Sequence, residues 1–149
     1  MPSYTIHLAV AKKYLEHHKE EDENAFYQGV IAPDLKEKPA SHFGKSSSRP
    51  DLKAYKEIVG LNSSYDRGYY LHLLTDKLFY RKYLAEGEFS KEIYNDYDKI
   101  NRSIIEAYQL KIPDEVKNKI FFMPGEPKII RKDIMKFIDW VGEMDLEKE

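Results

Sequence analysis

Apolar residues recur every three to four positions along most of this chain, the spacing that places them on one face of an α-helix. The strongest pattern covers 64–85, whose broad apolar stripe predicts a helix at the centre of the fold. The other helices are predicted over 4–19, 21–32, 51–59, 90–110, 114–122 and 132–143. No alternation of apolar and polar residues indicates a strand, so the expected fold class is all-α.

Local signals predict where two of these elements begin and end. Ser3 suits the N-cap of the first helix, because its hydroxyl can accept a hydrogen bond from a backbone N–H of the first turn. Pro33 is expected to end the second helix, since the residue before a proline favours an extended backbone. Residues 33–50 then form the longest irregular stretch, and a loop of this length in a compact domain is usually functional or disordered.

The composition limits both the architecture and the chemistry. A chain of 149 residues suits one domain, and no repeat or linker divides it, so 1–149 is predicted to be a single domain. The absence of cysteine excludes disulfides, thiolate metal ligands and a cysteine nucleophile. A metal must therefore be bound through nitrogen and oxygen atoms.

The charge gives little indication of a macromolecular partner. Twenty-four basic and 26 acidic side chains leave a net charge of -2, which provides no argument for nucleic acid or an anionic membrane. With 34% charged residues and a mean hydropathy of -0.67, no membrane span is expected. The N-terminal segment has neither a basic nor an apolar region of the kind found in secretory signals, so a cytoplasmic protein is expected.

A histidine and an aspartate lie one helical turn apart in the central predicted helix. His72 and Asp76 are at positions i and i+4, which places their Cβ atoms about 5–6 Å apart on one face. Their neighbours are apolar, and a buried polar group needs a partner because leaving it unpaired costs several kcal/mol. Taken alone, the pair favours a buried histidine hydrogen-bonded to the aspartate over two ligands of one metal.

Three further residues favour the metal. Asp34 comes at the edge of the irregular stretch and His42 lies within it, so both can reach a metal held by a rigid helix. His7 lies between apolar residues of the first predicted helix. His17 and His18, by contrast, belong to a charged run and are interpreted as a solvated helix end.

These residues form an ordered series of motifs. After His7 come Gly29-Val-Ile-Ala-Pro-Asp34, then Ser41-His42-Phe43, then Gly68-Tyr-Tyr-Leu-His72-Leu-Leu-Thr-Asp76. The series resembles the zinc-dependent phospholipase C family, most of all its small cytoplasmic bacterial members, over roughly the first 85 residues. That family is related to the single-strand-specific nucleases.

The resemblance implies an all-helical fold with a zinc cluster in a cleft between helices. Asp34, His42, His72 and Asp76 resemble the ligands of one zinc, and His7, with Asp76 as a bridge, resembles part of the site of a second. A third zinc of the family takes two later histidines and a glutamate, but no histidine follows His72 here. The carboxylates that could replace these ligands are Asp96, Asp98 and Glu106. One or two ions are therefore expected, zinc or another divalent metal.

Such a site predicts a metal-dependent hydrolase of phosphoester bonds acting on a small phosphorylated or phosphodiester substrate. Asp34 and Asp76 are the predicted catalytic carboxylates, with Asp76 bridging two ions and Asp34 either a ligand or the general base. The missing third-site histidines keep a second hypothesis open, a non-catalytic, metal-stabilised helical module that binds a ligand or a protein. An HD-type phosphohydrolase is set aside, because no histidine is followed by an aspartate.

A basic cluster follows His42 along the chain. It comprises Lys45, Arg49, Lys53 and Lys56. Contacts with an anionic substrate are one interpretation, and a solvated loop and helix face is the favoured one.

Overall fold

Helices account for the regular structure of residues 3–38, 40–84, 90–130 and 133–149, which the computed structural model describes. The α-helices are α1 (Tyr4–His17), α2 (Glu23–Leu35), α3 (Leu52–Ile58), α4 (Ser64–Leu78), α5 (Glu92–Tyr108) and α6 (Ile134–Gly142). Shorter turns are the 3₁₀ elements η1 (Ala40–His42) and η3 (Asp114–Lys119) and the π-helical turn η2 (Phe79–Tyr83). No strand occurs in these residues, which confirms the all-α prediction.

Side-chain caps explain where most of the helices begin. Ser3 caps α1 as predicted, its hydroxyl accepting a hydrogen bond from the Ile6 N–H at 3.4 Å. Asp22, Asp51 and Ser63 cap α2, α3 and α4 in the same way, each accepting from the backbone N–H three residues later. Each cap satisfies one of the N–H groups that the first turn of a helix leaves without an internal partner.

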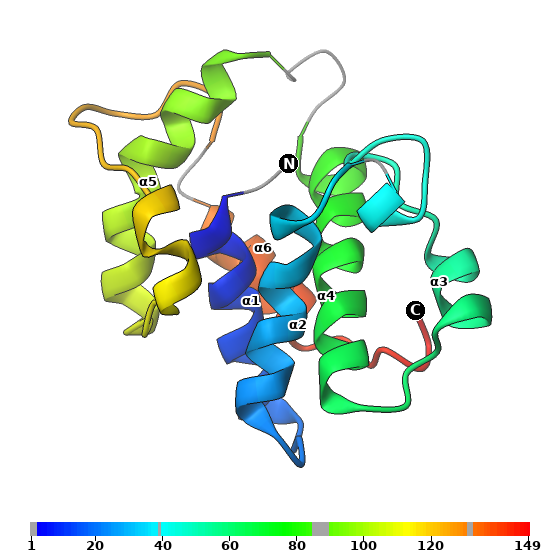
Figure 1. Ribbon diagram of the computed structural model, residues 1–149. Helices are drawn as coiled ribbons and strands as arrows, with labels where there is room; N and C mark the ends of the chain where they lie inside the picture. The colour runs from blue at the N-terminus through cyan, green and yellow to red at the C-terminus, as the bar shows by residue number, and fades with distance from the viewer. Residues whose placement is uncertain (1–2, 39, 85–89, 131–132) are drawn as a thin grey trace.

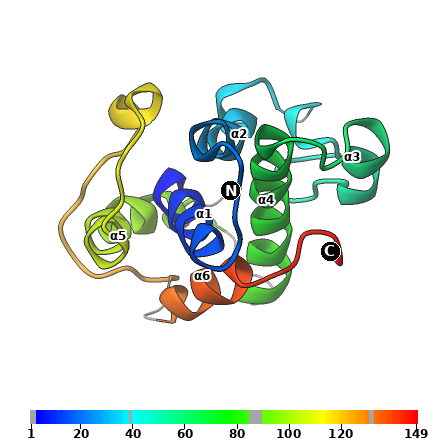
Figure 2. The same cartoon turned by 90° about the horizontal axis from the view of Figure 1, so that it is seen from below.

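Three helices, α1, α2 and α4, lie side by side at the centre of the fold (Figures 1 and 2). Helices α5 and α6 both pack against α1, and the short α3 packs against α4. Every residue of α4 from Gly68 to Asp76 is buried, so the prediction that this helix is central is confirmed. The chain folds as one compact helical domain around it.

Two glycines let α2 and α4 pack backbone against backbone. A Cβ on Gly29 would lie 2.1 Å from the carbonyl oxygen of Tyr65, and one on Gly68 would lie 2.1 Å from the carbonyl oxygen of Phe26. A side chain at either position would force the helices apart, because real Cβ atoms do not approach a carbonyl oxygen so closely. This close contact brings the second half of α2 against the part of α4 that carries His72.

The second helix continues through Pro33 to Leu35, so the prediction that Pro33 ends it was wrong. Proline has no N–H to donate to the Gly29 carbonyl, so the helix lacks one internal hydrogen bond there. The next carbonyl, that of Val30, accepts a hydrogen bond from Nδ1 of His72 at 2.7 Å, which ties this turn of α2 to α4. Packing against α4 thus outweighs the local preference, and Asp34 lies on the last turn of α2.

Other predicted boundaries moved for identifiable reasons. The α-helical part of 64–85 ends at Leu78 and continues as the π-turn Phe79–Tyr83, and residue 85 lies outside the described residues. Only Val116 of η3 is buried, too small an apolar face to hold a full helix over 114–122, and the turn ends at Lys119.

The remaining predicted helices correspond to α1, α3, α5 and α6. The first three agree to within two residues at each end. The prediction over 132–143 corresponds to α6, residue 132 lying outside the described residues, and its predicted inward side chains are buried: Ile134, Phe137, Ile138 and Val141. No helix among those described is both long and apolar enough to span a bilayer.

Candidate metal centre

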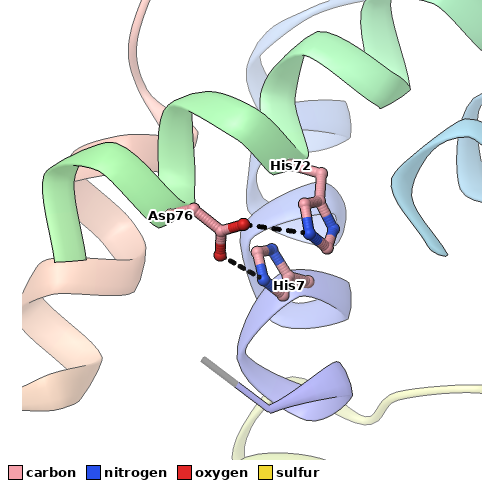
Figure 3. A group of neighbouring side chains, drawn as sticks. All are labelled: His7, His72 and Asp76. Carbon is pink, nitrogen blue, oxygen red and sulfur yellow. Dashed lines mark ion pairs between the residues drawn. The ribbon is translucent and has the colours of Figure 1, made fainter. Parts of the chain in front are cut away.

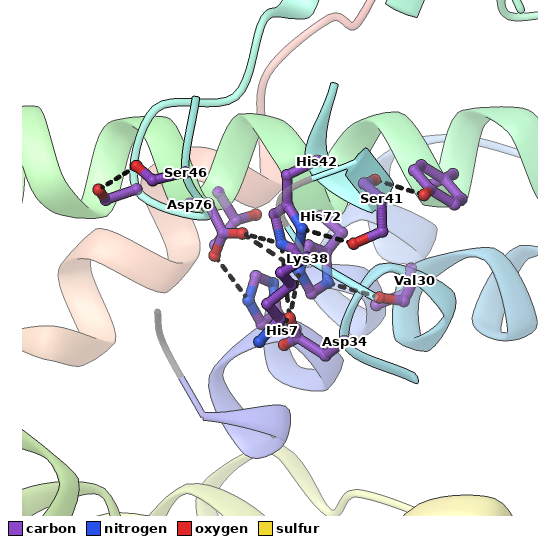
Figure 4. A network of polar contacts seen from close by, with 12 residues as sticks. His7, Val30, Asp34, Lys38, Ser41, His42, Ser46, His72 and Asp76 are labelled. Atoms are coloured by element: carbon purple, nitrogen blue, oxygen red, sulfur yellow. Dashed lines mark hydrogen bonds and ion pairs between the residues drawn. The ribbon is translucent and has the colours of Figure 1, made fainter. Parts of the chain in front are cut away.

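Five polar side chains converge where α1, α2, η1 and α4 meet (Figure 4). They are His7 on α1, Asp34 on α2, His42 on η1, and His72 and Asp76 on α4. None of the five side chains is more than 5% exposed. The structure therefore brings together the five residues predicted as ligands of the first two metal ions, from elements that span 70 positions of the chain.

Asp76 lies between the histidines and directs one carboxylate oxygen to each side. Its Oδ1 is 3.0 Å from Nε2 of His7, and its Oδ2 is 2.9 Å from Nε2 of His42 and 3.2 Å from Nε2 of His72 (Figure 3 shows His7 and His72). A carboxylate with its two oxygens engaged on different sides has the arrangement of a bridge between two cations.

Asp34 faces the same histidines from the end of α2. Its Oδ1 is 3.4 Å from Nε2 of His42 and 3.5 Å from Nε2 of His72. The same oxygen is 3.2 Å from Nζ of Lys38, four residues further along. The Tyr4 hydroxyl donates a hydrogen bond to the Asp34 carbonyl oxygen at 3.2 Å, which ties the end of α2 to α1.

The converging atoms are close together without being hydrogen-bonded. Within the described residues, Nε2 of all three histidines, Oδ1 of Asp34 and both carboxylate oxygens of Asp76 are buried and have no partner at hydrogen-bonding angles. The distances of 2.9–3.5 Å between these atoms are also those of ion pairs, so the alternative left open by the sequence, a buried histidine–aspartate pair, describes the contacts of the metal-free protein. Buried polar atoms of native proteins are almost always satisfied, so a shared cation at their centre is the simplest partner.

Two overlapping groups of these residues could hold a metal ion. One consists of His7, His72 and Asp76, and the other of Asp34, His42 and His72; within each, the ligand atoms lie within 4.8 Å of one another. Imidazole nitrogen and carboxylate oxygen suit zinc and several other divalent metals. Because a histidine nitrogen binds one ion, His72 can serve only one of the two groups at a time.

The ring orientation of two histidines is set by hydrogen bonds on the side away from the centre. Nδ1 of His72 donates to the Val30 carbonyl, since a carbonyl can only accept, and this leaves Nε2 facing the carboxylates. Nδ1 of His42 bonds with the Ser41 hydroxyl at 3.0 Å, and Nε2 again faces the centre. Metal-binding histidines are usually held by such a bond from their second nitrogen.

The irregular segment that carries His42 is held by aromatic packing. Phe43 adopts a left-handed backbone with φ of 57°, which turns the chain sharply after His42. The Phe43 ring packs edge-on against Tyr55 at 5.1 Å, and the Tyr69 hydroxyl donates a hydrogen bond to the Ser41 carbonyl. Backbone conformations of this kind cost energy and are concentrated at functional sites.

The histidines and aspartates perturb one another strongly. Burial by itself lowers the pKa of His72, but the charges of Asp34 and Asp76 outweigh it and raise that pKa to about 10. The pKa of His42 is raised by the same two carboxylates, also against burial. Burial and the nearby His72 lower the pKa of His7 to about 4 in spite of Asp76. Burial opposes ionisation of both aspartates, yet the histidines hold their pKa values well below the usual range.

These pKa shifts predict that metal binding releases protons. At pH 7 the metal-free protein carries a proton on His72, whose pKa is about 10, whereas His7, with a pKa of about 4, is already neutral. A metal takes the unprotonated nitrogen, so zinc affinity should rise with pH from 6 to about 9, roughly tenfold per pH unit for each proton displaced. Calorimetry at pH 7 in buffers of different ionisation enthalpy should count about one to two protons per zinc, and finding none would contradict the assignment of His72.

The three carboxylates considered for a third metal lie elsewhere. Asp96 is fully buried, but its oxygens accept hydrogen bonds from the backbone N–H groups of Lys128, Ile129 and Ile130 at 2.9, 2.6 and 2.9 Å. It therefore holds the segment before α6, and its carboxylate is not free to replace a third-site metal ligand. Glu106 is exposed on α5, while Asp98 lines a hollow that also reaches Asp34.

That hollow, which we call the Asp34 hollow, has a volume of about 320 Å³ and lies between α5, the segment after η3 and the adjoining ends of α1 and α2. Besides Asp34 and Asp98 it is lined by Tyr97 and by two residues that were not singled out from the sequence, Lys38 and Lys119. The i, i+4 spacing of Asp34 and Lys38 was a signal that could have identified Lys38.

The basic cluster predicted after His42 lies apart from the Asp34 hollow. Lys45, Arg49 and Lys53 line a different depression together with Lys77 and Arg81. Lys56 packs its ammonium 5.0 Å from the centre of the Tyr70 ring. None of these side chains lines the Asp34 hollow among the described residues, in agreement with the interpretation of a solvated surface.

Comparisons of the chain with protein-family models, with curated proteins and with solved structures find no match. The family resemblance suggested by the motifs stays a prediction.

Proposed function

We propose that this protein is a metal-dependent hydrolase of phosphoester bonds, that its metal is zinc, and that it is related to the zinc-dependent phospholipases C. One observation carries the proposal: six buried ligand atoms that lack hydrogen-bond partners in the described residues converge from five side chains, which follow one another in the order of the family motifs. Two carboxylates and three imidazoles are the donor set expected for hydrolytic zinc.

The residues divide between two positions. His42, His72, Asp34 and Oδ2 of Asp76 would hold one ion, because Nε2 of each of these two histidines lies within 3.5 Å of both Oδ1 of Asp34 and Oδ2 of Asp76. His7 and Oδ1 of Asp76 would contribute to a second. Zinc supplies Lewis acidity, which makes water more acidic and stabilises charge on a phosphoryl oxygen.

The two aspartates differ in access, and this separates their roles. Asp76 is fully buried and touches three histidines, so it acts as the internal support of the cluster. Asp34 is the one residue of the cluster that lines the Asp34 hollow in the described structure. We therefore assign to Asp34 the task of orienting the attacking water and accepting its proton, in addition to holding the ion. The substrate would be a small phosphomonoester or phosphodiester that enters by this hollow.

A second candidate function is a non-catalytic helical module that the metal stabilises. The observation in its favour is that four protein side chains can close the first position, as in structural zinc sites, which leave no place for a substrate. Asp96, a candidate ligand for a third metal ion, instead accepts hydrogen bonds from the backbone.

A hydrolysis assay decides between these functions. Zinc-loaded protein should hydrolyse p-nitrophenyl phosphate or bis(p-nitrophenyl) phosphate, and Asp34→Asn should lower kcat/KM by at least about 100-fold, the usual contribution of a positioned general base. Asp114→Asn, a change of an exposed carboxylate in η3, serves as the control and should leave the rate unchanged. Tight zinc binding without turnover of either ester would reject the hydrolase and favour the binding module.

A further inference from the structure

The Asp34 hollow contains a tyrosine with an unusual environment. Tyr97 comes from α5 and its side chain is only 5% exposed. Its ring packs 6.3 Å from Phe79 and 5.9 Å from Tyr94, which fixes it in place. The ring therefore belongs to the core while the residue lines the hollow that leads to Asp34.

The hydroxyl of Tyr97 is buried and has no hydrogen-bond partner in the described residues. Buried tyrosine hydroxyls usually find one, because leaving such a group unpaired costs about 1–3 kcal/mol. The buried Tyr55 and Tyr69 illustrate the usual case, since each donates its hydroxyl hydrogen to a protein oxygen, whereas the hydroxyl of Tyr70, like that of Tyr97, has no partner in the described residues. An unpaired donor beside a hollow is most simply explained by an acceptor that arrives with a ligand.

The protonation state of Tyr97 restricts what that ligand can be. Burial raises the pKa of its hydroxyl far above the usual value, and the charges of Asp76 and Asp34 raise it further. The group therefore stays neutral and offers a hydrogen at any physiological pH. A negatively charged oxygen is the best acceptor for such a donor.

The surrounding charges fit an anion once a metal is bound. Lys38 and Lys119 line the same hollow as Asp34 and Asp98, so the side-chain charges there are balanced. A divalent cation held by the cluster would make the inner end of the hollow positive. An anion entering the hollow would then meet the cation, the Lys38 ammonium and the Tyr97 hydroxyl.

We propose that the Asp34 hollow is an anion-binding pocket for a phosphate group, and that the Tyr97 hydroxyl donates a hydrogen bond to one of its phosphoryl oxygens. The proposal deepens the proposed function and rests on it for the identity of the substrate. It assigns Tyr97 as a substrate-binding residue that the family motifs do not contain.

Binding of inorganic phosphate to the zinc-loaded protein tests this assignment. Tyr97→Phe should weaken phosphate binding, measured by calorimetry, by roughly tenfold, the usual effect of losing one hydrogen bond to a charged group. The melting temperature should not fall, because the hydroxyl has no partner to lose. Zinc affinity should also be unchanged.

Tyr108→Phe is the matched control. The Tyr108 hydroxyl donates to Asp139 Oδ1 at 2.7 Å and does not line the Asp34 hollow, so this change should lower the melting temperature and leave phosphate binding intact.

Three results would overturn the proposal: no phosphate binding by wild type, equal binding by Tyr97→Phe, or a fall in the melting temperature of Tyr97→Phe like that of Tyr108→Phe. The last would mean that the hydroxyl supports the fold. Tyr97-dependent phosphate binding without ester hydrolysis would reject only the hydrolase, whereas ester hydrolysis with Tyr97-independent phosphate binding would reject only this pocket.

Discussion

Asp76→Asn is expected to weaken zinc binding by at least about 100-fold, more than the 10- to 100-fold typical of changes around a metal ligand. Asparagine has nearly the shape of aspartate but no charge. Asp76 contacts Nε2 of His7, His42 and His72 at 3.0, 2.9 and 3.2 Å, so its loss affects every histidine of the cluster. Zinc affinity is measured by competition with a chromophoric chelator.

The same variant should lose the stabilisation that zinc provides. A ligand present at 1,000 times its dissociation constant stabilises the folded state by about 4 kcal/mol, which for a domain of this size raises the melting temperature by about 8–16 °C. Wild type should show such a rise on zinc addition and a fall with a chelator, whereas Asp76→Asn should respond to neither. Asp66→Asn, on the first turn of the same helix, is the control and should behave as wild type. A full zinc response in Asp76→Asn would show that the ion is bound elsewhere.

The spacing of His72 and Asp76 could be predicted because it needs only the periodicity of a helix. Positions i and i+4 share a face in any α-helix, and the two side chains do meet, with 3.2 Å between Nε2 and Oδ2. Asp34 and His42 were found by motif order, and nothing local in the sequence places them against α4. Their position depends on the close packing of α2 and α4.

Pro33 shows how tertiary contacts overrule a local rule. The preference of the preceding residue for an extended backbone is real but weak, and here the helix is held by its burial against α4 and by the bond between Val30 and His72. The consequence reaches the site, because the extra turn carries Asp34 toward the histidines. A helix ending before Pro33 would have left Asp34 on a loop.

The roles of Tyr97 and Asp96 could not have been predicted from the sequence. The two residues are neighbours in an acidic and aromatic run, and both have the same kind of local context. Their roles differ because of contacts made by residues distant in the chain. Three backbone N–H groups at 128–130 donate hydrogen bonds to the Asp96 carboxylate, whereas the Tyr97 hydroxyl has no hydrogen-bond partner in the described residues. Hydrogen-bond satisfaction is a property of the packed structure, and no periodicity encodes it.

Gly68→Ala is expected to destabilise the protein by at least about 3 kcal/mol, a fall of roughly 6–12 °C in the melting temperature. Helix propensity alone predicts the opposite, a gain of about 1 kcal/mol, because alanine is the better helix former. The new Cβ would lie 2.1 Å from the Phe26 carbonyl oxygen, and backbone on both sides leaves no flexible group to yield. A loss rather than a gain in the free energy of unfolding would therefore show that α2 and α4 are in backbone contact at Gly68.

The same substitution should also impair the metal centre. Moving α2 away from α4 lengthens the bond between Val30 and His72 and carries Asp34 away from the histidines, so zinc affinity should fall together with stability. Melting curves with a chelator present isolate the packing effect, and titrations of the folded variant at low temperature isolate the effect on the site. Ser103→Ala, on the exposed side of α5, is the helical control and should stay within about 0.5 kcal/mol of wild type. If Gly68→Ala were as stable as wild type and bound zinc equally well, the contact of α2 with α4 could not be what positions Asp34 and His72.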